Sequence, residues 1–186
     1  GGVVDRNGES ADGCEAQQLP DAQLWVDSTA TGPLFDGSQN DPAKTIQAAV
    51  DQAPPHALIH IAPGSYPESV VVHVPYVTLQ GEQADAVEIH ALADTIGIEV
   101  VADGVTLSRM TVKGAAAGVT VRGSSEQPIA GFRAHQVVIN DTMAVDSETI
   151  SSTGLRLEHV DGAVVTLSSI QNVLGRTCPT CNELAG

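Results

Sequence analysis

The chain has 186 residues, enough for one domain with a continuous core and too few for a second full domain. Its 23 acidic and 8 basic side chains give a formal net charge of -15, which repels phosphate backbones and anionic lipids and excludes nucleic acid as an expected partner. No run of about eighteen apolar residues is present, so we expect no insertion into a membrane.

The first segment, residues 1–23, is rich in polar residues and glycine, which predicts an acidic, partly flexible lead-in. It opens with two glycines rather than with a charged and then apolar leader, so we expect any targeting segment to have been removed. Asp5, Asn7 and Asp12 place oxygen ligands around glycines and make Ca²⁺ the one candidate cofactor, but they complete no EF-hand pattern. A solvated tail that requires no cofactor is the favoured interpretation.

One helix is expected, after a possible edge strand at residues 24–26 and a turn-rich loop at 27–41. Asp41 is placed to cap a helix over about residues 42–53, with Pro42 at its first position. Its apolar face would contain Ile46, Ala49, Val50 and Ala53. Because it precedes a series of strands, this helix would cap one end of a stacked core.

From Ala57 onward the sequence consists of short β-branched segments separated by turn residues, with no second helix-length pattern. Gly97-Ile-Glu-Val, Gly118-Val-Thr-Val and Gly154-Leu-Arg-Leu share one template, and the triplet Val-Thr-Leu recurs at positions 77, 105 and 165. Such repeats predict an all-β parallel β-helix, or solenoid, of about 4–6 coils over residues 24–175, followed by a tail at 176–186. A β-sandwich is the competing fold.

Stacking of the coils would also align charged side chains. We expect one outward column made of Glu99, Thr120 and Arg156, and a neighbouring one made of Val101, Arg122 and Glu158. Arg122 and Glu158 would then pair across adjacent coils, which is a structural role.

Three stretches of the first half form an ordered set of motifs: Lys-Thr-Ile-Gln-Ala-Ala-Val-Asp-Gln-Ala at 44–53, Ile-His-Ile-Ala-Pro-Gly-Ser-Tyr-Pro-Glu at 59–68 and Val-Thr-Leu-Gln-Gly at 77–81. They resemble the opening of pectin-lyase-like right-handed β-helices, a group that includes pectin methylesterases, polysaccharide lyases and bacterial surface proteins. The resemblance covers about residues 24–81 and implies a right-handed parallel β-helix in a protein that is secreted or displayed on a bacterial cell surface.

The resemblance also bears on activity. Gly64-x-Tyr66-x-Glu68 looks like a pectin methylesterase motif, but residues 140–142 and 174–176 match only fragments of that family's later catalytic motifs. A related lyase would need a basic residue to remove a proton beside a uronate carboxylate. The candidates, which would equally serve as substrate-binding residues, are Arg109, Lys113, Arg122 and Arg133. Outward polar positions on strands are the simpler interpretation of all four.

Cys14, Cys178 and Cys181 form an odd set, the last two within Cys-Pro-Thr-Cys. A disulfide between two of the three, in an exported protein, is favoured over a redox or zinc motif because no second metal-ligand pair completes a site.

Two functions remain open. The favoured one is a noncatalytic secreted or cell-surface module that binds a polysaccharide or another surface partner, or acts as a rigid spacer, because no cluster of acids and bases is visible. The alternative is a polysaccharide-active enzyme, a lyase or carbohydrate esterase, acting on acidic glycans. The last coil has no obvious cap, which predicts self-association through the end of the solenoid or a covering tail.

Overall fold

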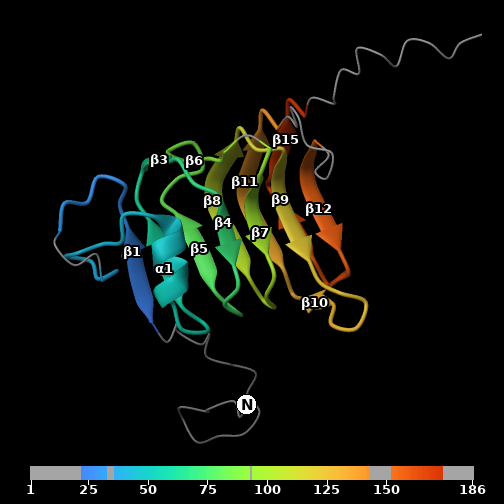
Figure 1. Ribbon diagram of the computed structural model, residues 1–186, viewed down its shortest axis with the longest axis horizontal. Coiled ribbons are helices and arrows are strands. Elements are labelled where there is room, and N and C mark those ends of the chain that lie inside the picture. The colour runs from blue at the N-terminus through green and yellow to red at the C-terminus, as the bar shows by residue number, and fades with distance from the viewer. Residues whose placement is uncertain (1–21, 33–35, 93, 143–151, 174–186) are drawn as a thin grey trace, which may run out of the picture.

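The computed structural model describes residues 22–32, 36–92, 94–142 and 152–173. This part of the chain is all-β apart from one short helix, and every strand pair in it is parallel. Figure 1 shows the strands side by side along the long axis, with helix α1 beside β1 at one end and β12 and β15 at the other. No helix in these ranges is long and apolar enough to cross a membrane.

The strands form three sheets. The long sheet has the order β1 (Gln23–Val26), β2 (Leu58–Ile61), β5 (Thr78–Gly81), β8 (Thr106–Lys113), β11 (Arg133–Asn140), β14 (Val164–Thr166). It is widened by β3 (Gly64–Tyr66), β6 (Val87–His90) and β15 (Ser169–Gln171). A four-stranded sheet contains β4 (Val70–Val72), β7 (Ile96–Val100), β9 (Ala117–Arg122) and β12 (Thr153–Glu158), and a two-stranded sheet pairs β10 (Ile129–Ala130) with β13 (Val160–Asp161).

Paired strands are separated by a variable length of chain. The interval runs from 20 residues between Leu58 and Thr78 to 36 between Val121 and Leu157. The two larger sheets and the helix contribute to one apolar core, in which Ile59, Leu79 and Ile98 are completely buried. Burial alternates along β2 and β6, because successive side chains of a strand point to opposite faces.

The glycine template is confirmed. Gly118 lies in register between Gly97 and Gly154, because the flanking residues of β7, β9 and β12 are paired. A Cβ atom on Gly118 would overlap Cγ2 of Ile139 and would lie 2.8 Å from the carbonyl oxygen of Gly154. Glycine is therefore required because the long sheet approaches the four-stranded sheet closely at this level.

The Val-Thr-Leu triplets are aligned only in part. Thr78 pairs with Thr106, the threonine at the same position of the second triplet. Thr166 instead occupies the column of Ser108, because both residues are partners of His135. The third triplet is therefore displaced by two residues from the column of the other two, a shift that keeps every side chain on its original face.

Helix α1 (Ile46–Gln52) is shorter than the expected 42–53, and its N-cap is Thr45 rather than Asp41. The Thr45 hydroxyl accepts a hydrogen bond from the amide of Ala48. Ala43, which the sequence placed in the helix, instead pairs with the sheet through a parallel bridge to Val26. Helix α1 packs against β1, β2 and β4 at the first end of the sheets, and its residues Ile46, Ala49 and Val50 are completely buried.

Candidate functional site

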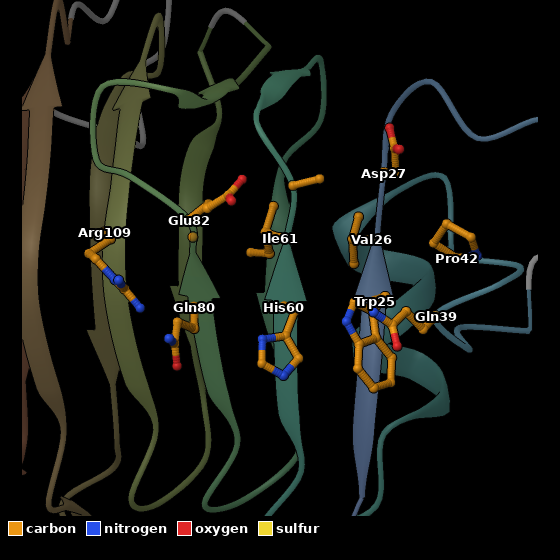
Figure 2. A pocket seen from close by; sticks show the side chains of 12 residues that line it. Trp25, Val26, Asp27, Gln39, Pro42, His60, Ile61, Gln80, Glu82 and Arg109 are labelled. Atoms are coloured by element: carbon orange, nitrogen blue, oxygen red, sulfur yellow. The ribbon is translucent and has the colours of Figure 1, made fainter.

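A groove of about 350 Å³ lies on the outer face of the long sheet, over β1, β2, β5 and the middle of β8. Its lining includes Trp25, His60, Gln80 and Arg109, with Asp27 and Glu82 at one side. Figure 2 shows that the first four form a row across neighbouring strands. We call these six residues the Trp25 groove.

Register explains the row. Trp25 pairs with His60, His60 with Gln80 and Gln80 with Ser108, so the outward side chain of each strand meets that of the next. The rings of Trp25 and His60 are stacked, with centroids 5.1 Å apart and planes inclined by 20°. Burial lowers the pKa of His60 below its ordinary value of 6.5, which favours the neutral imidazole. The stack is therefore a largely uncharged aromatic surface.

Arg109 enters the groove through an irregularity in β8. Its φ of +54° is left-handed, and it falls between the stretch of β8 that pairs with β5 and the stretch that pairs with β6. A Cβ atom on Gly81 would overlap the Arg109 carbonyl oxygen, so the glycine admits this turn of the backbone. In Figure 2 the guanidinium lies beside Gln80. The strand interruption thus adds a cation to a row of neutral groups.

Two carboxylates border the groove. Asp27 follows β1 and accepts hydrogen bonds from the amide of Thr29 at 2.8 Å and from its hydroxyl at 2.7 Å. Glu82 follows β5, and its amide donates to the carbonyl oxygen of Ile61 at 3.2 Å. With Arg109 as the single cation in the lining, the groove carries a slight negative charge. The described residues hold no cluster of His, Cys, Asp or Glu that could bind a metal ion.

The four predicted basic residues do not meet in one site. Only Arg109 lines the Trp25 groove. Lys113 forms an ion pair with Glu88 at 2.6 Å, and this hydrogen bond, followed by one from His90, lowers the pKa of the Glu88 carboxyl. Arg133 is exposed on β11, in register with Thr106, and Arg122 belongs to the four-stranded sheet.

Arg122 is the centre of a charged network on that second sheet. Its guanidinium lies 3.1 Å from Glu158, as the stacking predicted, and 3.2 Å from Glu99. Arg156 is also paired with Glu158, at 2.5 Å. The register of Glu99, Thr120 and Arg156 is confirmed. The expected exposure of Thr120 is wrong: it is 1% exposed and its hydroxyl has no hydrogen-bond partner, because this short side chain lies between two longer ones.

The Gly64-x-Tyr66-x-Glu68 element has a structural role in this chain. The Glu68 carboxylate accepts hydrogen bonds from the amides of Ile46 and Gln47, at 2.8 and 3.0 Å. Tyr66 is buried and its hydroxyl donates to the carbonyl oxygen of Ala62 at 2.7 Å. These contacts give both the tyrosine and the glutamate a structural role.

Several predicted site residues lie outside the described part of the chain. They are Asp5, Asn7, Asp12, Cys14, Cys178 and Cys181. The Ca²⁺ interpretation of the lead-in, the disulfide and the two end segments therefore stay predictions.

Sequence reasoning missed the Trp25 groove, although a signal was present. Trp25, His60 and Gln80 each lie in a strand just after an inward apolar residue, namely Leu24, Ile59 and Leu79. Superimposing the three segments on those apolar residues would have placed the three polar or aromatic residues in one outward column. Intervals of 35 and 20 residues between the strands hid the relationship.

In a comparison with protein families, residues 30–177 match the family described as "Protein of unknown function (DUF1565)". No curated protein and no solved structure matches the chain.

Proposed function

The chain belongs to the DUF1565 family, and from this premise we propose that it is a secreted or cell-surface, noncatalytic right-handed parallel β-helix that binds carbohydrate in the Trp25 groove. The observation that carries the proposal is the row formed by the Trp25–His60 stack, Gln80 and Arg109.

Three features support the β-helix part of the proposal. All strand pairs in the described residues are parallel, so the chain must return to the starting end of the sheet before each new strand begins. One core is shared by both larger sheets, as in a coil that winds through each sheet in turn. Right-handed connections are the rule for parallel strands, at about 98% of cases, and about 4–6 coils fit the chain length.

The chemistry of the groove favours a sugar. A pyranose ring has a face of C–H groups that packs on an aromatic ring, and Trp25 is the only tryptophan in the chain. The hydroxyls around such a ring need donors and acceptors in fixed positions, which Gln80, Arg109 and the two carboxylates supply. Adjacent strands are about 4.8 Å apart, so a row across four strands accommodates more than one sugar unit.

The charge of the groove favours an uncharged glycan. The lining contains one guanidinium and two carboxylates, and the whole chain carries a net charge of -15. A polyuronate would be repelled unless a cation bridged it to the protein. We therefore expect neutral oligosaccharides to bind more tightly than acidic ones, and to do so without Ca²⁺.

The test is calorimetric titration of the full chain with matched neutral and uronate oligosaccharides. Fluorescence of Trp25 gives a second readout at the site itself, because this is the only tryptophan. Trp25→Ala is expected to reduce affinity at least tenfold, as loss of a central aromatic anchor does. Tyr76→Ala is the control, since Tyr76 is 49% exposed and stacks on His56, away from the groove lining.

Two results would contradict the proposal. One is sugar binding that survives Trp25→Ala unchanged, which would move the site elsewhere. The other is release of unsaturated uronide or methanol from a polysaccharide, with or without Ca²⁺, which would make the chain an enzyme.

A further inference from the structure

The end of the sheets opposite helix α1 exposes a concentration of apolar side chains. This end, formed by β12, β13, β14 and β15, is called the open end below. Of the ten large hydrophobic residues exposed in the described part of the chain, six lie here. They are Leu157, Val164, Val165, Leu167, Ile170 and Val173, with Leu167 the most exposed at 77%.

Within the described part of the chain, the strands of the open end are also the last strands of their sheets. Among the described strands, β12 pairs only with β9, β13 only with β10, and β14 and β15 only with β11. Their outer edges therefore present rows of amide and carbonyl groups that another strand edge could pair with. An apolar cavity of about 70 Å³ lies just inside, between residues of the long and four-stranded sheets that include Ile139, Leu155 and Ile170.

We propose that the open end docks on the open end of a second copy of this chain, forming a two-fold dimer. The other end cannot serve as the partner surface, because α1 covers it and buries Ile46, Ala49 and Val50 completely. A head-to-tail array is thereby blocked. Contact between like ends is the remaining way for two copies to meet through exposed strand edges, and such a contact is closed by symmetry.

Charge supports a second copy as the occupant. Residues 152–173 contain one arginine, Arg156, against two acids, Glu158 and Asp161. Arg156 and Glu158 are already paired with each other. The described residues of the open end are therefore almost neutral in a chain whose net charge is -15, so like ends approach with less repulsion than contacts elsewhere on the chain would meet.

The test is the molar mass of the full chain in solution, measured by light scattering over a range of concentrations. We expect twice the mass of the 19.1 kDa chain at high concentration. Leu167→Glu combined with Val164→Glu should return the mass to that of one chain, with an unchanged thermal unfolding profile. Leu92→Glu is the matched control, because Leu92 is 62% exposed but lies between β6 and β7, so this variant should remain dimeric.

Other outcomes overturn the proposal. A wild-type monomer at every concentration does so, and so does a dimer that persists in the Leu167→Glu, Val164→Glu variant. A dimer that forms only after residues 174–186 are deleted would assign the open end to that tail. Failure of sugar binding leaves this inference intact, because the Trp25 groove lies over β1 to β8, at the other end of the sheets.

Discussion

The carboxylate of Glu68 accepts a hydrogen bond from the backbone amide of Ile46 at 2.8 Å, across 22 residues of sequence. The same carboxylate also accepts from the next amide in α1. Amides in the first turn of a helix have no partner within it, so a side chain from outside satisfies them. Glu68 therefore holds the helix that covers one end of the core.

This contact predicts a stability change. Glu68→Ala should lower the free energy of unfolding by about 1–3 kcal/mol, because two partly buried amides lose a charged acceptor. Chemical denaturation measures the change, with Glu126→Ala, in an exposed turn, as the control. Equal stability of the two variants would show that solvent caps the helix as well as Glu68 does.

Tyr66 gives a prediction at high pH. Burial raises the pKa of its hydroxyl to about 12, so the folded protein holds this proton more tightly than the unfolded chain, whose tyrosine pKa is 10.0. The stabilisation from Tyr66 is thus complete below pH 10 and is lost as the pH rises toward 12. Ultraviolet titration of the phenol, compared in wild type and Tyr66→Phe, should assign the late transition to this residue. Tyr66→Phe should itself cost about 1 kcal/mol at neutral pH.

The Glu88–Lys113 pair gives a prediction at low pH. Because the folded-state pKa of Glu88 lies below its ordinary value of 4.5, its contribution to stability is present above pH 4.5 and fades as the pH falls through the lower value. The stability difference between wild type and Glu88→Gln should therefore be greatest at neutral pH and vanish in acid. We expect it to stay below about 1 kcal/mol, because both side chains are partly exposed. A difference that grows on acidification would contradict the assigned pair.

Gly118 gives a prediction about packing. Gly118→Ala should destabilise the fold by about 1–3 kcal/mol, since the added methyl group would overlap Ile139. Combining it with Ile139→Ala should recover part of that loss, and a double-mutant cycle measures the coupling. Gly162→Ala gives the opposite case for comparison, because its φ is +66° and nothing lies within 4 Å of the added atom, whereas Gly118 has no positive φ and a crowded site. Strictly additive losses at Gly118 and Ile139 would refute the contact.

Local patterns predicted the parts of the fold that depend on period and composition. The glycine template, the aligned triplets at 77 and 105, and the Arg122–Glu158 pair all follow from stacking strands in register. The displaced register of the third triplet could not be read from the pattern, because an alternating pattern is unchanged by a shift of two residues.

Other features depend on contacts that a linear pattern does not contain. Helix α1 begins at Ile46 rather than at residue 42 because Ala43 pairs with β1. Helix propensity does not include this pairing with a distant strand. The Trp25 groove needed the register of strands separated by unequal intervals, and Arg109 enters it only through an irregular backbone. Thr120 is buried because longer side chains on the adjacent strands cover it, although threonine itself is polar.

The unequal intervals between paired strands indicate that the connecting segments of this fold can change in length. Register is preserved whether 20 or 36 residues separate two partners, so the length of chain between paired strands can vary. The exposed turn at 124–128, between β9 and β10, lies in one such connecting segment. Lengthening a turn adds little closure entropy, about 0.6 kcal/mol for each doubling. The scaffold should thus tolerate grafted peptides there, and gain new recognition loops, while its layers stay in place.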